Sequence, residues 1–147
     1  MLNTEENQMA VIKEVLVENS FKAIYYNNGV IEIIWDSLLE TVEVIHLNQI
    51  REVLNNLGGG QKMPLFFSFH AFLTISPDAR KDAATYEGGR YTLANALLID
   101  NLAKKILFNF FLKINKPKIP TKGFLTREEA IDWLLKLQKK ERKTVSC

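Results

Sequence analysis

Residues Leu93–Phe124 read LANALLIDNLAKKILFNFFLKINKPKIPTKGF and form the most hydrophobic and most one-sidedly charged part of the chain. Residues 93–99 are apolar enough for a buried strand. An Asp-Asn pair then caps a helix that we predict over residues 101–112. Two prolines stop this helix, so a loop follows over residues 115–122. A buried strand, a helix and a return into a further strand predict an α/β fold.

Upstream of this stretch, residues 21–26 and 30–35 are rich in β-branched and aromatic side chains. The Asn-Gly pair between them tolerates the positive φ angles of a tight turn, so the two runs predict a β-hairpin. One face of the second run is fully apolar, and we expect it to point into the core; it consists of Ile31, Ile33 and Trp35. Periodicity does not decide whether residues 11–17 form a first strand.

The remaining elements follow from apolar spacing and from helix caps. We predict a helix over residues 44–57 with Arg51 on its polar side, a strand over 64–69, a helix from Ser76 to about residue 87, a brief strand over 123–125 and a final helix. Ser76 suits the N-cap of its helix, and Thr126 with Glu129 forms a capping box for the last one. The expected fold is a mixed sheet that opens with an antiparallel hairpin and continues with alternating strands and helices.

Length and composition restrict the possible classes of protein. A chain of 147 residues makes one domain, which we place at residues 11–139 between a flexible N-terminus (1–10) and a charged C-terminal tail (140–147). A net charge of +2 does not favour a nucleic-acid partner. The single cysteine, Cys147, allows no intrachain disulfide. The N-terminus lacks the features of a secretion signal, and no apolar run could span a bilayer, so we expect a cytoplasmic protein.

Several segments resemble a known family. PLFFSFHAFLTISPDAR (64–80) places a strand, a short loop and a capped helix in the order found in STAS domains, which are related to the CRAL-TRIO-like lipid-binding fold. ISPDARKDAA (75–84), NFFLKINKPKIPTKGF (109–124) and REEAIDWL (127–134) are similar to small uncharacterised bacterial STAS-like proteins. The resemblance implies a STAS-like fold and a regulatory role, and it brings no catalytic residues.

In anti-sigma-factor antagonists, which are STAS proteins, a serine at the start of this helix accepts phosphate from a kinase. In this chain Asp78 stands at the acceptor position, and Ser68 stands where the preceding strand aspartate is expected. The resemblance therefore does not carry a phosphorylation switch over to this chain. Ser76, the nearest serine, has a structural task as the N-cap.

No set of residues predicts a reaction, a metal site or a cofactor. The two histidines, His46 and His70, lack neighbours spaced as metal ligands or as catalytic partners. Because ligands bind at the carboxyl ends of parallel strands, we expect any ligand cleft to be bordered by residues at those ends. The candidate cleft residues are His70, Ser76, Asp78 and Asp100.

The segment 104–122 contains six lysines and no acid, interleaved with phenylalanines. The candidate interaction surface consists of Lys104, Lys105, Phe108, Phe111, Lys113, Lys116 and Lys118. Such a segment either binds an anionic membrane surface or single-stranded nucleic acid, or only places lysines in solvent around phenylalanines that belong to the core. The helix 101–112 is apolar around most of its circumference, which favours an additional contact with a neighbouring helix and with a second subunit.

We therefore expect a non-enzymatic, STAS-like regulatory or protein-interaction module that forms a homodimer and binds an unidentified protein partner. The alternative is a carrier or sensor that binds a small apolar or lipid-like ligand, or an anionic membrane surface, near the helix 101–112.

Overall fold

The computed structural model describes residues 9–146, with side chains up to residue 141. The predicted flexible N-terminus thus falls almost wholly outside the described residues, as does Cys147. The main element is a six-stranded sheet in the order β1-β2-β3-β5-β7-β8. Its strands are β1 (Val11–Val17), β2 (Phe21–Tyr26), β3 (Ile31–Trp35), β5 (Met63–Ser68), β7 (Thr92–Leu98) and β8 (Thr121–Phe124).

The first three strands are antiparallel, and β3, β5, β7 and β8 run parallel to one another. The predicted fold class, an α/β fold whose mixed sheet opens with an antiparallel hairpin, is confirmed. Residues 11–17 form the edge strand β1, which the sequence pattern leaves undecided. The hairpin turn contains Gly29 at a φ of 93°, a conformation that favours glycine.

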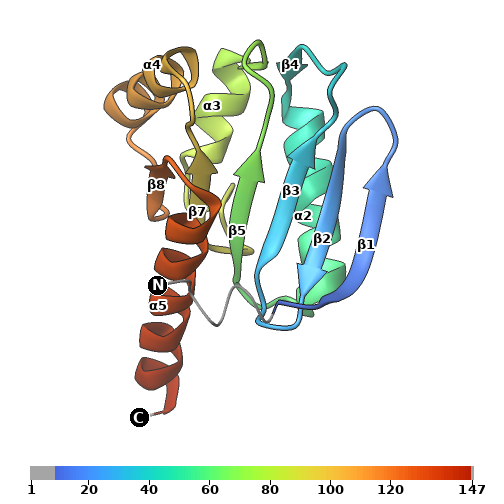
Figure 1. Ribbon diagram of the computed structural model, residues 1–147, viewed down its shortest axis with the longest axis vertical. Helices are drawn as coiled ribbons and strands as arrows, with labels where there is room; N and C mark the ends of the chain where they lie inside the picture. The colour runs from blue at the N-terminus through green and yellow to red at the C-terminus, as the bar shows by residue number, and fades with distance from the viewer. Residues whose placement is uncertain (1–8, 147) are drawn as a thin grey trace.

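The helices are α2 (Val44–Gly58), α3 (Pro77–Ala83), α4 (Leu102–Phe110) and α5 (Arg127–Ser146), and a π-helix, η1 (Phe111–Asn115), continues α4. The parallel strands β3, β5, β7 and β8 follow one another in chain order towards one edge of the sheet. Because the connections between such strands are right-handed, their connecting helices lie on the same face. Helix α2 lies behind the sheet as drawn in Figure 1, whereas α5 crosses its front. The sheet is therefore covered on both faces except at the edge strand β1, whose side chains are mostly exposed.

Three helices differ from the predicted bounds. Helix α3 ends at Ala83 instead of residue 87, because Thr85 Oγ1 donates a hydrogen bond of 2.8 Å to the carbonyl of Asp82 and the chain turns. Helix α4 widens into a π turn after Phe110. Helix α5 continues to Ser146, through most of the segment that we expected to be a tail, because residues 136–146 contain no glycine or proline to stop it.

A second, two-stranded sheet connects two loops at the carboxyl ends of the parallel strands. Its strands, β4 (Thr41–Val42) and β6 (Thr74–Ile75), pair in parallel, and the hydroxyl oxygens of Thr41 and Thr74 lie 3.0 Å apart. Two residues are too few for an alternation pattern, so the sequence analysis missed both strands. They link the segment before α2 to the segment before α3.

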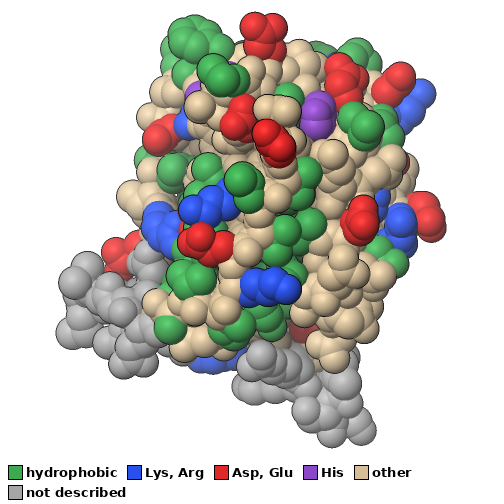
Figure 2. All heavy atoms as spheres, turned by 90° about the vertical axis from the view of Figure 1, so that its right-hand side faces the viewer, with side chains coloured by type: hydrophobic (Ala, Val, Ile, Leu, Met, Phe, Trp, Pro, Cys, Tyr) green, Lys and Arg blue, Asp and Glu red, His purple; other side chains and the backbone are tan. Residues whose placement is uncertain are grey.

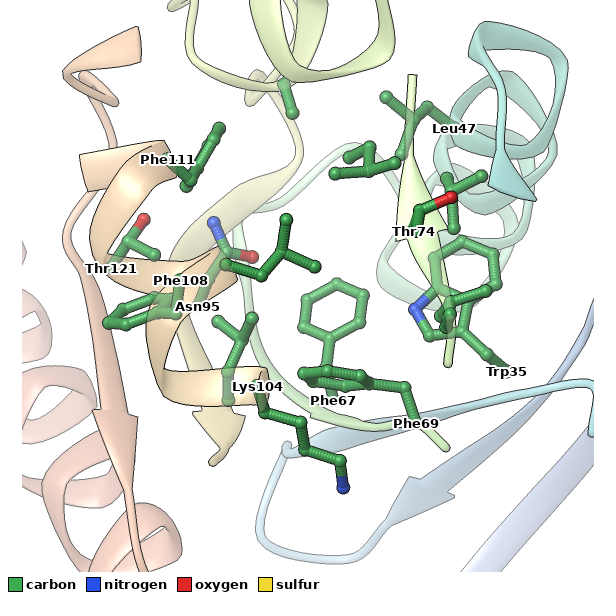
Figure 3. A pocket seen from close by; sticks show the side chains of 16 residues that line it. Trp35, Leu47, Phe67, Phe69, Thr74, Asn95, Lys104, Phe108, Phe111 and Thr121 are labelled. Carbon is green, nitrogen blue, oxygen red and sulfur yellow. The ribbon is translucent and has the colours of Figure 1, made fainter. Parts of the chain in front are cut away.

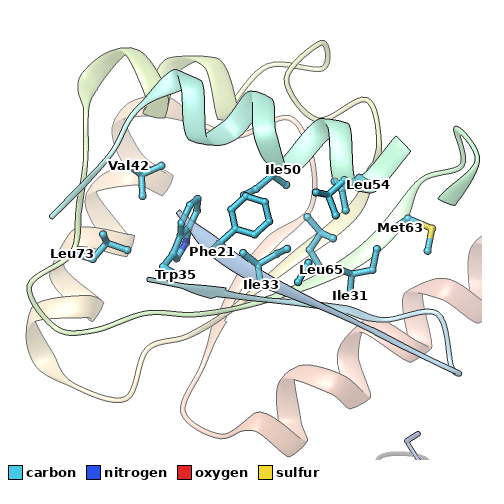
Figure 4. Packing of buried hydrophobic residues seen from close by; sticks show 12 residues of the cluster. Phe21, Ile31, Ile33, Trp35, Val42, Ile50, Leu54, Met63, Leu65 and Leu73 are labelled. Carbon is cyan, nitrogen blue, oxygen red and sulfur yellow. The ribbon is translucent and has the colours of Figure 1, made fainter. Parts of the chain in front are cut away.

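The core has two parts, one on each face of the sheet. Ile31, Ile33 and Trp35 point towards α2, as the apolar face of β3 predicts, and pack with Phe21 and Ile50 (Figure 4). The opposite face of β3 is also largely buried: Ile34 packs against the cluster beneath α5, and Glu32 is 5% exposed. Both faces of this strand are therefore interior.

The structure corrects the prediction that Arg51 belongs to the polar side of α2. Its side chain is buried, and Nη1 lies 2.8 Å from Asp82 Oδ2 and donates to the carbonyl of Gly88 at 3.1 Å. Asp82 and Gly88 belong to α3 and to the loop that follows it. The ion pair thus fixes α2 against this part of the chain.

Helix α5 is anchored by apolar packing and by one charged cluster. Arg127 Nη1 donates to Glu32 Oε1 at 2.7 Å, and the Tyr26 hydroxyl donates to the same oxygen at 2.8 Å. Burial, followed by the hydrogen bond to Glu32, raises the pKa of Tyr26. The cluster compensates the buried carboxylate of Glu32 with a cation and a hydroxyl.

Candidate functional site

A pocket with a free volume of about 150 Å³ lies between the sheet and α4, on the face covered by α2 and α3. We call it the α4 pocket. Sixteen residues line it, and all but four of them are apolar (Figure 3). Trp35, Phe67 and Leu97 come from the carboxyl-terminal parts of β3, β5 and β7. The pocket thus occupies the position at which parallel sheets commonly bind ligands.

The alternation of β7 creates the floor of the pocket. Ala94 and Ala96 point to the opposite face and pack beneath α5, so Asn95 and Leu97 point towards the pocket. On the neighbouring strands, the rings of Trp35 and Phe67 stack with their centroids 6.3 Å apart and an interplanar angle of 17°. These rings form a rigid apolar base.

Helix α4 forms one wall of the pocket. Leu107, Phe108 and Phe111 line it from this side, and Phe108 is only 6% exposed. The short strands β4 and β6 form part of another wall, with Val42, Thr74 and Ile75. Hence two elements that the sequence pattern does not reveal, β6 and the π turn, both contribute to this pocket.

Lys104 is the charged residue of the lining. It is 7% exposed, its Nζ donates to Asp100 Oδ1 at 2.8 Å, and its ammonium lies 4.9 Å from the centroid of the Phe69 ring. The hydrogen bond from Lys104 holds the pKa of Asp100 below its ordinary value. The lysine is therefore already compensated, and the pocket presents little net charge to a ligand.

Asn95 is the polar residue of the lining that remains available to a ligand. Among the described residues its side-chain amide makes no hydrogen bond, whereas the hydroxyls of Thr74 and Thr121 are bonded to Glu40 and Ile119 carbonyls. In Figure 3 the Asn95 amide stands on the strand floor beside Phe108. The sequence signal for this residue is a single asparagine in the apolar run 93–99, but Asn95 was not among the predicted site residues.

The four candidate cleft residues do not line the α4 pocket. His70 joins two loops: its Nδ1 accepts from the Phe72 amide at 3.2 Å, so Nε2 carries the proton and donates to the Leu39 carbonyl at 2.7 Å. Ser76 Oγ accepts from the Ala79 amide at 3.1 Å and is the predicted N-cap. These two side chains have structural partners.

The two aspartates of the predicted cleft also lie outside the pocket. Asp78 is exposed in the first turn of α3, where a carboxylate complements the helix dipole. Asp100 contacts the pocket only through Lys104. The expected position at the carboxyl ends of the strands is thus occupied by an apolar pocket in place of a polar cleft.

The candidate interaction surface divides into two groups. Lys104 and Phe108 are buried and Phe111 is half-buried, and all three line the α4 pocket. The other members are exposed, namely Lys105, Lys113, Lys116 and Lys118. The prediction that all seven share one outer surface is corrected for the three inner residues, because the helix turns them towards the sheet.

The described part of the chain contains no group of three or more histidine, cysteine, aspartate or glutamate side chains placed to hold a metal ion. Over the same residues, no helix combines the length and the apolar character required to cross a membrane. The site is thus an apolar pocket with one available amide, an arrangement suited to binding.

The sequence model of one family, described as a domain of unknown function (DUF7793), matches residues 24–138. The chain belongs to this family. The match extends from β2 to α5 and includes every residue of the α4 pocket. No curated protein matches.

Two solved structures are similar to this chain. One is an uncharacterised protein of the DUF3478 family with a SpoIIAA-like fold from Shewanella loihica PV-4, with 13% identity, a TM-score of 0.46 and coverage of 86% of this chain and 93% of that one. The other is a protein of unknown function from Arthrobacter sp. FB24, with 21% identity, a TM-score of 0.27 and coverage of 76% and 96%. Neither description names a ligand or a partner.

Proposed function

We propose that this protein is a non-enzymatic regulatory module that binds a small apolar ligand in the α4 pocket. The observation that carries the proposal is the lining itself, which is apolar except for Thr74, Asn95, Lys104 and Thr121. An apolar cavity of about 150 Å³ is large enough for a molecule of the size of benzene. A regulatory role rests on the STAS-like resemblance.

Asn95 defines the ligand chemistry further. Its amide can donate and accept, and it stands in surroundings where water finds few other polar partners. A ligand with an apolar body and one hydrogen-bonding atom could pair with this half-buried amide. Phenol is therefore a better probe than benzene.

The proposal is tested by NMR titration of the ¹⁵N-labelled chain with benzene and with phenol. We expect shift changes at Phe67, Leu97 and Phe108, and tighter binding of phenol. Leu107→Trp fills the pocket from α4 and should abolish both effects, whereas Leu102→Trp, on the exposed side of the same helix, should abolish neither. Unchanged spectra of the wild-type protein with both probes would contradict the proposal.

The second candidate is a protein-interaction module that forms a homodimer through α4. The observation that favours it is the exposure of Leu102 and Ile106, at 72% and 62%, on the side of α4 that faces away from the sheet. Light scattering coupled to size-exclusion chromatography tests it at micromolar concentrations. Only monomers at these concentrations would eliminate the dimer.

A further inference from the structure

The outer side of α4 and η1 carries a line of exposed apolar side chains. Leu102, Ile106, Phe110 and Ile114 are 72%, 62%, 46% and 58% exposed. They follow one another at intervals of four residues, and we call them the outer stripe. Single exposed apolar residues are common on protein surfaces, but four in a line need an explanation.

The π turn reduces the rotation of the outer stripe around the helix axis. In an α-helix each step of four residues exceeds a full turn by about 40°, so a stripe with this spacing drifts around the helix. A π turn contains more residues per turn and therefore counteracts the drift. Because η1 covers residues 111–115, the step from Phe110 to Ile114 adds less drift than the α-helical steps before it, and Ile114 is 58% exposed.

The surroundings of the stripe are basic. No acidic residue occurs between Asn101 and Arg127, and four exposed lysines near the stripe form a basic rim, namely Lys105, Lys113, Lys116 and Lys118. Asp100, directly before the segment, is paired with Lys104. Aliphatic side chains with lysines around them are the composition of helices that lie in a membrane interface.

The neighbouring helix α3 adds further cations. The guanidinium carbon of Arg80 lies 5.2 Å from the centroid of the Phe110 ring, and Lys81 lines a groove with Ile114. Of the acids on α3, Asp82 is paired with Arg51, and Asp78 in the first turn is exposed. The potential over the stripe is thus positive.

We propose that the outer stripe and the basic rim dock this protein on an anionic lipid surface, with α4 lying in the interface. A second copy of the chain fits this patch less well, because a two-fold contact would place lysines against lysines. Single-stranded nucleic acid binds by stacking successive bases on aromatic side chains, and Phe110 is the one aromatic member of the stripe. Nucleic acid therefore fits this surface less well than lipid does. This surface goes beyond the proposed ligand pocket, which lies on the inner side of the same helix.

Another face of the molecule provides a contrast. Figure 2 views the protein from the β1 side, where acidic and basic side chains are interspersed with apolar ones. Strand β1 has three exposed apolar residues, Val11, Ile12 and Leu16, but charges of both signs lie on this face. Exposed apolar residues also occur elsewhere, for example Leu38 and Phe72 at 86% and 87% exposure, but they are not arranged along one helix. Those two residues provide matched controls.

The test is co-sedimentation of the full chain with vesicles of phosphatidylcholine, with and without phosphatidylglycerol, at low and at moderate salt. We expect binding only to the anionic vesicles, and weaker binding as salt rises. The variant Ile106→Ser/Ile114→Ser should lose binding, whereas Leu38→Ser/Phe72→Ser should keep it. Replacing Lys105 or Lys113 by Gln should weaken binding roughly fivefold each, whereas Lys62→Gln should not.

Thermal melting of each variant shows whether it is folded, since the changes are at exposed positions. Equal binding to neutral and anionic vesicles, or no binding to either, would overturn the proposal. A concentration-dependent dimer that Ile106→Ser/Ile114→Ser abolishes would also overturn it, in favour of a second copy. No stripe residue lines the pocket, so the titration with phenol tests the proposed ligand site in a separate measurement.

Discussion

Helices α4 and α5 each follow a parallel strand, but their hydrophobicity and their burial are related in opposite ways. Helix α5 is highly charged along its length, but Ala130, Ile131 and Leu134 are fully buried beneath the sheet. Helix α4 is mostly apolar, but Leu102 and Ile106 are exposed. The more hydrophobic helix is thus the less buried one, which shows that placement of apolar residues, and not their number, decides burial.

The comparison predicts the largest loss of stability on the α5 side. Leu134→Ala removes a fully buried side chain and leaves a cavity, so the free energy of unfolding should fall by about 3 kcal/mol. Urea denaturation followed by circular dichroism measures it. A loss of less than about 1 kcal/mol would mean that α5 is not an essential part of the core.

The charged anchor of α5 provides the second test. Arg127→Met removes the cation beside Glu32, and the free energy of unfolding at neutral pH should fall by about 2 kcal/mol, less than for a fully buried pair because the Arg127 side chain is 38% exposed. Adding Glu32→Gln should restore part of the loss, since the buried charge then disappears. If the double variant is no more stable than Arg127→Met, the cluster is not an electrostatic anchor.

The equivalent anchor of α4 is the ion pair between Lys104 and Asp100. It contributes less stability than the Arg127 cluster, and its contribution is lost at acid pH. Because Lys104 lowers the pKa of Asp100 in the folded state, the unfolded chain takes up a proton first as pH falls. The stabilisation is therefore present above the unfolded pKa, about 3.9, and is lost as pH falls through the folded pKa. Asp100→Asn should lower stability at pH 7 by about 1 kcal/mol, because the carboxylate is half-exposed but its loss leaves the ammonium of Lys104, whose side chain is 8% exposed, without a counter-charge.

Carbon-detected NMR titration of the Asp100 carboxyl checks the direction of this shift. A titration midpoint at or above about 3.9 would show that the contact with Lys104 does not form in solution. Lys104→Met should return the midpoint to the ordinary range.

The outer stripe should give the smallest effect on stability. Ile106→Ser changes a side chain that is 62% exposed, so the free energy of unfolding should change by less than about 0.5 kcal/mol. Thermal and urea unfolding measure it in the absence of lipid. A large loss would mean that the outer side of α4 is buried in solution, by a second copy or by another part of the chain.

The features that were predictable from the sequence are those with local causes. The Asn-Gly turn and the Ser76 cap depend on residues within a few positions of one another, and the structure contains both. Of the predicted capping box, the structure contains the hydrogen bond from the Glu129 amide to Thr126 Oγ1, while Glu129 Oε1 accepts from the Thr126 hydroxyl. The order of strands and helices follows from hydrophobic period. These signals need no knowledge of distant partners.

The features that were missed depend on distant partners. Arg51 is buried because Asp82 and Gly88 lie across from it, and Glu32 is buried because Arg127, 95 residues later, reaches it. The α4 pocket combines residues of seven or more segments, so no spacing reveals it. Only the lone Asn95 in an apolar strand was a sign that this face is not fully packed.

The position of α4 between the pocket and the outer surface has a thermodynamic consequence. Phe108 lines the inside and Ile106 belongs to the outside of one short helix, so any occupant that moves α4 changes the other side as well. The two binding equilibria are then linked. A ligand that raises the affinity of the protein for the surface by some factor is bound more tightly by the surface-bound protein, by the same factor. If both proposed sites bind, phenol in the pocket should change the affinity for anionic vesicles by the same factor by which the vesicles change the affinity for phenol.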